Sequence, residues 1–294
     1  MTAAMLLAAG HGTRLKPLTD RFPKALVPIG DRPVIAHVID NLRSKLGNVK
    51  LVVNAHHEAQ LLVEFLASYD ANIEVLVEAD LLGTAGGVRA AQPHFEKGPV
   101  IVANADILTN PNYLDLLSNC DSSGCSLCVS CRPPGLGSIG VDSKGNVVRM
   151  RGEIFGDEVT GADYVGVAAL GAAAIEGLPA FGCLIGDWAL PRLRRAESIK
   201  AHFDSASWTD IGEISAYAGA NWAWLSARNL GSWTASDARV RTGTSLVDTI
   251  VGSGASIETT GPLSKVIVWP GALVTEPMND CVVMAGGRVV PIRA

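Results

Sequence analysis

Short apolar segments alternate with helical patterns through the first 225 residues, and this alternation restricts the fold most. Strand-like apolar segments occupy residues 4–8, 50–54, 73–77 and 100–103. Apolar residues at helical spacing occupy residues 33–46, 59–67 and 86–91. Strands that alternate with helices predict a Rossmann-like, three-layer α/β domain with a mixed, mainly parallel sheet.

A glycine-rich loop follows the first strand directly. Gly10 and Gly12 frame it, Arg14 stands at its end and Lys24 follows ten residues later. Glycines allow backbone N–H groups to approach a phosphate closely, and two cations nearby favour a ligand with several negative charges. In parallel sheets ligands bind at the carboxyl ends of strands, where both this loop and Asp106 are expected. The pattern predicts a site for a nucleoside triphosphate.

Two common nucleotide-binding loops do not fit this segment. A dinucleotide fingerprint requires a third glycine, but Leu15 stands there. The phosphate loop with a Gly-Lys-Ser/Thr ending is absent from the sequence. A nicotinamide-dependent oxidoreductase is therefore disfavoured.

The longer string resembles the signature of sugar-1-phosphate nucleotidyltransferases, L-A-A-G-x-G-T-R-L-x-P-L-T-x-x-x-P-K, here running from Leu7 to Lys24. Three further segments resemble motifs of that family in the same order: Leu82–Gly87, Asn104–Asp106 and Trp208–Gly212. The resemblance covers residues 4–225 and is greatest to mannose-1-phosphate guanylyltransferases, with N-acetylmuramate-1-phosphate uridylyltransferases also close. It implies that a nucleoside triphosphate and a sugar 1-phosphate react to an NDP-sugar and pyrophosphate.

The resemblance also implies roles for individual residues. Arg14 would bind the triphosphate and leaving group, Lys24 the phosphates around the α-phosphorus, and Asp106 and Asp210 would hold Mg²⁺ as hard oxygen ligands. The implied nucleotide-binding residues are Leu7, Ala8, Ala9, Gly10, Gly12, Thr13, Arg14, Lys24, Glu78, Gly83, Thr84 and Asn104. The implied sugar-binding residues are Gly140, Tyr164 and Gly166.

Several positions leave alternatives open. A carboxylate at Glu78 would accept hydrogen bonds from guanine, or it is a solvated charge at a strand end. Many relatives carry a Glu-Lys-Pro segment whose Lys holds the sugar phosphate, but this chain has Arg151 in that region, so the acceptor and even its being a sugar stay open. Asp163 would bind a hydroxyl or face solvent. His56 and His57 are interpreted as structural rather than metal-binding.

The function itself has alternatives. GTP with mannose or a related sugar 1-phosphate is the first expectation, and a UTP-dependent uridylyltransferase is the second. A non-catalytic subunit that binds an NDP-sugar and regulates a partner is disfavoured, because such paralogues typically lose the loop cations or the metal carboxylates that this chain retains.

The sequence changes character after about residue 230. Glycine, valine and other small residues recur irregularly up to residue 294, which resembles imperfect hexapeptide repeats. We expect a catalytic domain over 1–230 and a short β-rich, left-handed β-helix-like module over 231–294. Because such coils bury their faces only by stacking, the module is a candidate surface for a homo-oligomer.

Charge and cysteine content narrow the partners. The net charge of −5 argues against nucleic acid, and apolar stretches are too short to span a membrane. The first residues lead directly into the loop without a basic signal-peptide region, so a cytoplasmic location is expected. The spacing of Cys120, Cys125, Cys128 and Cys131 superficially resembles a metal-cluster motif. Residues 126–131 are strand-like, however, and residues three apart on a strand point to opposite faces, which spoils chelation by Cys125 and Cys128. The inferred compartment disfavours disulfides.

Overall fold

The computed structural model describes residues 2–96 and 98–292, and the chain forms two compact units. The first, which we call the sheet unit, comprises the residues up to His11 together with Val38–Trp208. The second, which we call the β-helix unit, comprises Gly12–His37 together with the residues from Thr209 onward. The domain boundary expected near residue 230 remains a prediction.

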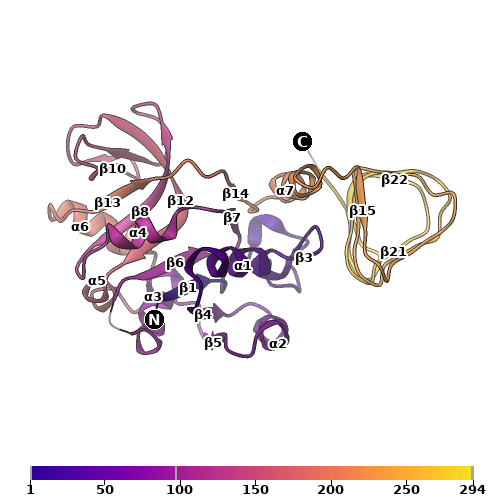
Figure 1. Cartoon of the computed structure of the whole chain (residues 1–294), viewed down its shortest axis with the longest axis horizontal. Coiled ribbons are helices and arrows are strands. Elements are labelled where there is room, and N and C mark those ends of the chain that lie inside the picture. Colours follow the sequence, from indigo (N-terminus) through magenta and orange to yellow (C-terminus); the bar gives the residue numbers. More distant parts are fainter. Residues whose placement is uncertain (1, 97, 293–294) are drawn as a thin grey trace. The chain divides into compact units, whose positions relative to one another are not determined.

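The sheet unit is built on one ten-stranded sheet (Figure 1). Its strands are β1 (Thr2–Leu7), β4 (Val49–Ala55), β5 (Glu74–Val77), β6 (Val100–Asn104), β8 (Cys125–Arg132), β9 (Ile139–Val141), β10 (Val147–Met150), β11 (Glu153–Ile154), β12 (Thr160–Leu170) and β13 (Lys200–Phe203). Strands β6, β1, β4 and β5 are neighbours in that order and all parallel, while β12 runs antiparallel to β6, β8 and β9. The predicted mixed sheet with its parallel nucleotide-binding portion is confirmed.

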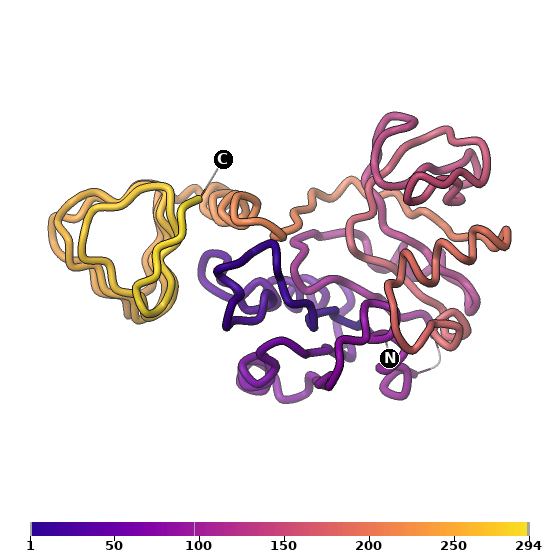
Figure 2. The backbone as a smooth tube through the Cα atoms, turned by 180° about the vertical axis from the view of Figure 1, so that it is seen from behind, coloured from indigo at the N-terminus to yellow at the C-terminus, as the bar shows by residue number. Residues whose placement is uncertain are grey.

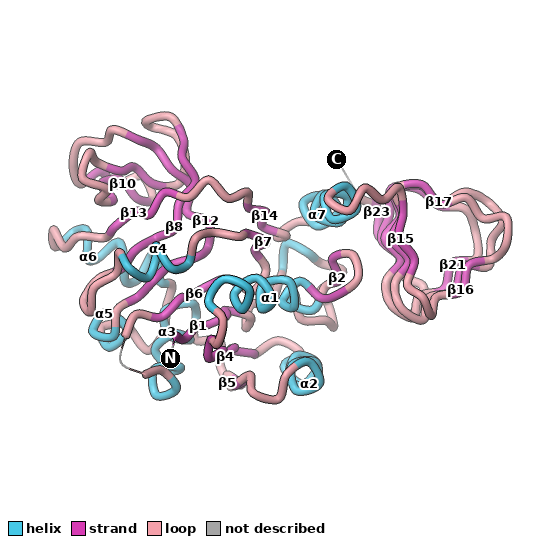
Figure 3. Tube along the Cα trace, in the orientation of Figure 1, coloured by secondary structure: helices cyan, strands magenta, loops and turns pink. Residues whose placement is uncertain are grey.

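Figure 3 shows the helices in cyan. They are α1 (Val34–Leu46), which begins in the β-helix unit, then α2 (Ala59–Tyr69), α3 (Gly83–Ala91), α4 (Tyr113–Ser118), α5 (Ala172–Glu176) and α6 (Leu190–Arg194). Helix α2 packs on β4 and β5, α3 on β1 and β4, and α4 on β6, β8 and β12. Among the described residues, no helix is both long and apolar enough to cross a membrane.

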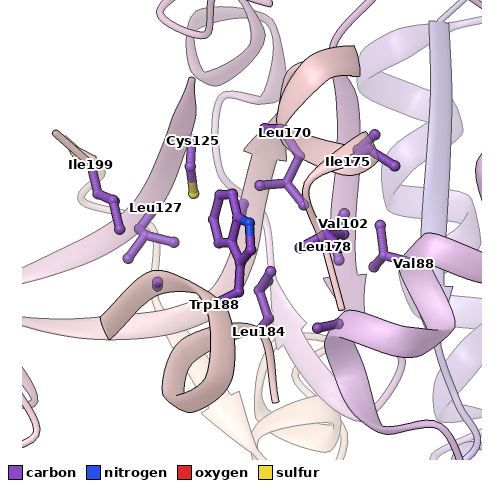
Figure 4. Packing of buried hydrophobic residues seen from close by; sticks show 14 of the residues in the cluster. Val88, Val102, Cys125, Leu127, Leu170, Ile175, Leu178, Leu184, Trp188 and Ile199 are labelled. Carbon is purple, nitrogen blue, oxygen red and sulfur yellow. The ribbon is translucent and has the colours of Figure 1, made fainter. Parts of the chain in front are cut away.

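The main core lies between β8, β12 and a π-helical turn at Leu184–Ala189. Trp188 is 5% exposed and packs among aliphatic side chains that include Leu127 and Leu170 (Figure 4). Burying a large aromatic side chain in this way removes apolar surface from water, and each Å² of that surface stabilises the folded state by about 25 cal/mol. This cluster fixes β12 against β6 and so holds the edge of the sheet from which Asn104 emerges.

The β-helix unit contains a helix, a small hairpin and a coil of short strands. Helix α7 spans Ile214–Ser226, and β2 (Pro28–Ile29) pairs with β3 (Arg32–Pro33). The other strands are β15 (Ser232–Thr234), β16 (Arg239–Val240), β17 (Leu246–Val247), β18 (Thr249–Val251), β19 (Ser256–Ile257), β20 (Leu263–Val268), β21 (Leu273–Val274), β22 (Met278–Val283) and β23 (Val289–Pro291). Strands β15, β18, β20 and β22 stack in parallel, as do β16, β19 and β21.

The stacked strands confirm the β-helix-like module expected from the small-residue pattern. Its turns superimpose as one roughly triangular loop (Figure 2). Inward-facing aliphatic side chains fill the coil, among them Val251, Val266, Val274 and Val283. The last strand, β23, runs antiparallel to β22 and ends the parallel stack.

One local expectation needs adjustment. Helix α3 begins at Gly83 rather than at Gly86, so Gly86 and Gly87 lie inside it. The region 164–175 contains most of the eleven-residue strand β12, buried between β6 and β8. An unbroken run of small apolar residues carries neither helical nor strand periodicity, so the sequence alone does not identify this central strand.

Candidate active site

The carboxyl ends of the parallel strands bring distant polar residues to one edge of the sheet. Leu7, the last residue of β1, pairs in register with Asn54 of β4 and with Asn104 of β6. Ala8–Gly10 continues from β1, and Asp106 follows β6 by two residues. The expected placement of the glycine loop and Asp106 at strand ends is confirmed.

A buried polar network supports the start of this loop. The Ala8 backbone N–H donates to Asn54 Oδ1 at 2.8 Å, and Asn54 Nδ2 donates to Glu78 Oε1 at 2.7 Å. The other carboxylate oxygen of Glu78 accepts from the Leu82 N–H at 3.0 Å. Gly87 gives this network room, because a Cβ there would lie 2.6 Å from Asn54 Nδ2. The network fixes the path of the chain at Ala8.

Glu78 was open between a base-reading carboxylate and a solvated charge. It is only 8% exposed, so the solvated alternative is wrong. Both of its oxygens accept hydrogen bonds from within the sheet unit. A base-reading role would use the lone pairs that these bonds leave, because each carboxylate oxygen has more than one acceptor site.

The Leu82–Gly87 motif packs against the segment that precedes the π-helical turn. Gly83 has φ +77°, and a Cβ there would lie 2.4 Å from the Gly182 carbonyl oxygen. A Cβ at Gly86 would likewise lie 2.4 Å from the Ala180 carbonyl oxygen. Thr84 Oγ1 accepts from the Leu184 N–H at 2.7 Å. Glycine is required at 83 and 86 for close backbone packing, whatever ligand lies nearby.

In the β-helix unit, a tight turn places the two predicted cations. Gly12 has left-handed backbone angles (φ 61°, ψ 32°), and its carbonyl oxygen accepts from the buried Thr19 hydroxyl at 2.8 Å. A Cβ at Gly12 would lie 3.0 Å from Thr19 Cγ2 and 3.1 Å from Lys24 Cβ. Arg14 projects into solvent, whereas the Lys24 side chain is 11% exposed. The left-handed turn therefore lets Lys24 lie directly behind the loop.

Arg14 and Lys24 converge on Asp210. Lys24 Nζ lies 3.4 Å from Asp210 Oδ1, and Arg14 Nη2 lies 3.4 Å from Asp210 Oδ2. Asp210 ends strand β14 (Trp208–Asp210), and Gly212 follows it. A Cβ at Gly212 would lie 2.7 Å from Arg14 Nη2, so the guanidinium occupies the space that a side chain would take. Three of the four predicted catalytic residues thus meet in the β-helix unit, although Arg14 and Asp210 are 196 positions apart along the chain.

The predicted sugar residues lie on β9 and β12. Gly166 has φ +72°, and a Cβ there would lie 3.0 Å from Asn104 Nδ2. Tyr164 packs against the core, its N–H donates to Ser138 Oγ at 3.0 Å, and burial raises the pKa of its hydroxyl. Gly140 is a glycine for a packing reason, because a Cβ would lie 2.1 Å from Glu158 Oε2. Gly166 and Asn104 are therefore neighbours, while Gly140 backs onto the Glu158–Arg149 ion pair.

The open positions have defined surroundings. Asp163 accepts from Arg132 Nε at 2.6 Å, so it does not simply face solvent. Arg151 directs its guanidinium toward Cys183 Sγ at 3.5 Å. His56 bonds the Glu78 carbonyl oxygen at 3.0 Å, and its ring lies edge-on to that of His11. These contacts make His56 a structural part of the loop support.

The cysteines follow the strand interpretation. Strand β8 covers the predicted segment, and Cys125 and Cys128 are both buried within it. Burial raises the pKa of the Cys128 thiol to about 12, so it stays protonated. Across residues 2–96 and 98–292, no group of three or more His, Cys, Asp or Glu side chains is arranged to hold a metal ion on its own.

Three residues that shape the site were not predicted. Asn54 carries the loop support, Thr19 fixes the left-handed turn, and Gly212 admits the Arg14 guanidinium. Asn54 had a visible signal, because a polar residue ends an apolar strand there. Thr19 and Gly212 stand inside the Leu7–Lys24 and Trp208–Gly212 motifs, but no role was assigned to either. Thr19 bonds a carbonyl seven residues away, whereas the role of Gly212 depends on Arg14, far away in the chain, which spacing does not reveal.

The fold and the arrangement of these residues define a nucleotide-handling α/β protein. A family model described as nucleotidyl transferase matches residues 3–151, just over half of the 294-residue chain. The chain belongs to the nucleotidyl transferase family. Sugar nucleotidyltransferases of this family generally need a divalent metal ion.

Individual relatives match part of their length. The mannose-1-phosphate guanyltransferase of Debaryomyces hansenii is 35% identical over 126 residues, which are 41% of this chain and 34% of that protein. The bifunctional protein GlmU of Methanococcus aeolicus is 28% identical over 148 residues, 50% of this chain and 35% of that protein. The chain thus spans about a third of the length of these curated relatives.

A solved structure supports the fold independently. HddC from Yersinia pseudotuberculosis, crystallised in complex with GMP-PN, superimposes with a TM-score of 0.64 at 23% identity. The match covers 76% of this chain and 100% of that one.

Proposed function

We propose that this protein is a sugar-1-phosphate nucleotidyltransferase that uses GTP and mannose 1-phosphate or a related sugar 1-phosphate. The observation that carries the proposal is the convergence of Arg14 and Lys24 on Asp210 at 3.4 Å each. Two cations beside a glycine turn suit a triphosphate, and a carboxylate between them suits an enzyme that also handles a cation. The names of the guanyltransferase relatives support the choice of base and sugar.

The proposed reaction needs no protein nucleophile. An oxygen of the sugar phosphate, already ionised, attacks the α-phosphorus and forms a new P–O bond while the bond to the β-phosphate oxygen breaks. Pyrophosphate leaves with that electron pair. Catalysis then consists of positioning and charge neutralisation. Lys24 would neutralise the charge that develops at the α-phosphate, and Arg14 the charge on the departing pyrophosphate.

Asp106 and Asp210 are the proposed Mg²⁺ ligands. Their hard carboxylate oxygens fit this ion, and two carboxylates leave coordination positions for phosphate oxygens and water. When bound, Mg²⁺ would neutralise phosphate charge. In the described structure Asp210 contacts the two cations instead, so we expect the triphosphate to draw Arg14 and Lys24 away and free the carboxylate.

The remaining roles are also proposals. Ala8–Gly10 and Thr13 would offer backbone N–H groups to the phosphates, Gly83 and Thr84 would lie beside the base, and Tyr164 and Gly166 beside the sugar. Arg151 would replace the missing lysine toward the sugar phosphate. Both substrates are metabolites of the cytoplasm, where we place the protein. The β-helix module would provide a surface for self-association.

A substrate matrix tests the proposal. Purified protein with Mg²⁺ is mixed with GTP, UTP, CTP, ATP or dTTP and with mannose, glucose, N-acetylmuramate or heptose 1-phosphate, and pyrophosphate release is measured. Lys24→Gln should lose at least about 100-fold in kcat/KM, as expected for removal of a charge-stabilising group. Lys144→Gln, in an exposed hairpin turn of the sheet unit, is the matched control.

Each outcome of the matrix decides something. Release with GTP and mannose 1-phosphate supports the full proposal, whereas release only with UTP supports the uridylyltransferase. No release from protein that still binds an NDP-sugar would favour a regulatory subunit. Release that is equal in wild type and Lys24→Gln would contradict the assigned site.

A further inference from the structure

The segment between the two predicted cations lies against the β-helix coil. Residues 13–24, which we call the cation segment, carry Arg14 at one end and Lys24 at the other. The Phe22 ring lies 5.1 Å from the Trp269 ring, centroid to centroid and tilted by 49°. Asp20 also accepts from Arg288 Nη1 at 2.9 Å. Both Trp269 and Arg288 belong to the coil, so the coil contacts the cation segment in its half nearer Lys24.

Trp269 is itself held rigidly. It follows strand β20 directly and is 3% exposed. Its Nε1–H donates to the Tyr217 hydroxyl at 3.0 Å, and Tyr217 of α7 is fully buried. A buried indole N–H with a partner has one preferred orientation, because losing that partner leaves an unsatisfied donor. The Trp269 ring is therefore a fixed surface against which Phe22 rests.

The same helix fixes the chain beyond the second cation. Asn221, one turn after Tyr217, accepts from the Gly30 N–H at 2.9 Å and donates to the Tyr217 carbonyl oxygen. Gly30 lies against the Trp224 ring so closely that a Cβ would come within 2.1 Å of it. Residues 22–30 are thus held by Trp269 at one end and by α7 at the other. Lys24 lies between these two anchors.

We infer that Trp269, Tyr217 and Phe22 are positioning residues that set the places of Arg14 and Lys24 for the triphosphate. The coil is then a working part of the nucleotide site and not only a surface for assembly. The inference rests on the proposed function, because it takes Arg14 and Lys24 as the triphosphate cations. The Lys24 side chain is almost covered, and its Nζ lies 3.4 Å from Asp210 Oδ1. A small shift of the segment would therefore move the Lys24 charge away from the bound triphosphate.

Point variants of the whole chain test this role. Phe22→Ala and Trp269→Ala should lower kcat/KM for the nucleoside triphosphate at least about tenfold, since misplacing a catalytic group by about 1 Å can cost about 100-fold in rate. KM for the sugar 1-phosphate should stay within about twofold, because neither variant touches a residue assigned to the sugar. Trp269→Phe keeps a ring beside Phe22 but loses the hydrogen bond to Tyr217, so it should recover only part of the loss.

The control is a ring contact away from the cation segment. Phe65 of α2, in the sheet unit, stacks on Tyr69 at 5.5 Å between ring centroids. Phe65→Ala therefore removes a comparable ring contact and should leave the kinetic parameters for both substrates unchanged. If Phe65→Ala impairs use of the triphosphate as much as Trp269→Ala does, the effect is general loosening and the inference fails.

Hydrogen–deuterium exchange separates this inference from the proposed function. In Phe22→Ala, peptides covering residues 12–26 should exchange about tenfold faster than in wild type, while peptides from α7 and the coil should not change. Unchanged exchange at 12–26 would overturn the inference even if the enzyme is active. A wild type that releases no pyrophosphate would overturn the proposed function, and faster exchange at 12–26 would still support a grip by the coil.

Discussion

At the scale of single residues, Asp210 is the point where charges meet. It receives Lys24 and Arg14 at 3.4 Å each, and its own side chain remains 35% exposed. Asp106 stands two residues beyond β6 at the ligand-binding edge of the sheet.

We expect Asp106→Asn and Asp210→Asn to abolish turnover with the fold intact. An amide keeps the shape of the side chain but loses the charge that Mg²⁺ binds, which should cost several kcal/mol of transition-state stabilisation, or about 100-fold or more in kcat. Pyrophosphate release and circular dichroism measure the two effects. Asp157→Asn, an exposed carboxylate of the sheet unit, is the control. Near-wild-type turnover in either variant would refute the metal assignment.

The two loop glycines should behave differently. A Cβ at Gly10 meets nothing within 4 Å, whereas Gly12 has a left-handed backbone and would place a Cβ 3.0 Å from Thr19. Gly10→Ala should leave the melting temperature unchanged but weaken triphosphate binding, because the methyl enters the open face of the loop. Gly12→Ala should destabilise the fold by about 1–2 kcal/mol, the cost of a left-handed conformation. Thermal melts and nucleotide titrations distinguish the two, and equal melting shifts would contradict this distinction.

Glu78 shows what sequence reasoning can and cannot reach at this scale. Its place after a strand near the Leu82–Gly87 motif was visible in the sequence. Its burial beneath Asn54 and Leu82 was not, because both contacts depend on how β4 and α3 pack. The motif residues Arg14, Lys24 and Asp210 were found because their types and order are distinctive, although nothing in their spacing gives the 3.4 Å contacts.

At the scale of elements, the beginning of α1 carries a partly buried histidine. His37 bonds the Ile29 carbonyl oxygen at 2.9 Å, and burial lowers its pKa below the ordinary value of 6.5. The unfolded chain therefore binds more protons than the folded chain once the pH falls below 6.5. The stability that the neutral ring provides is complete above pH 6.5 and is lost as the pH falls toward the lower folded pKa.

His37→Gln should remove this pH dependence. The glutamine amide donates to the same carbonyl oxygen but does not titrate. Between pH 7.5 and pH 5, wild type should lose more melting temperature than the variant, and above pH 6.5 the two curves should run in parallel. Melting curves at half-unit pH steps provide the measurement. Curves that stay parallel down to pH 5 would show that His37 is not the group responsible.

The strands and helices themselves were largely readable. Strands β4 and β6 correspond to the strands predicted at 50–54 and 100–103, because short apolar runs predict buried strands. Helix α2 corresponds to the helix predicted at 59–67, because its apolar residues recur at helical spacing. The assignment of residues 12–37 to the β-helix unit was not readable. It depends on side chains such as Trp269 and Asn221, which lie about two hundred residues away along the chain.

At the scale of the whole molecule, the proposed ligands call for a metal that arrives with the nucleotide. Asp106 and Asp210 supply two carboxylates, whereas Mg²⁺ usually takes six oxygen ligands and keeps several waters. Phosphate oxygens and water would supply the others. The affinity for Mg²⁺ alone should then be low, and the affinity for the pair of metal and nucleotide high.

Thermal unfolding in four conditions checks this expectation. Mg²⁺ alone and EDTA alone should leave the melting temperature within about 1 °C of the untreated protein, since weak binding adds little to stability. GTP with Mg²⁺ at about 100 times its Kd should add about 2.7 kcal/mol, or roughly 5–10 °C. EDTA added to that mixture should remove most of the shift and stop pyrophosphate release, and fresh Mg²⁺ should restore both. A melting temperature that EDTA lowers in the absence of nucleotide would reveal a structural metal site and contradict binding of the metal with the substrate.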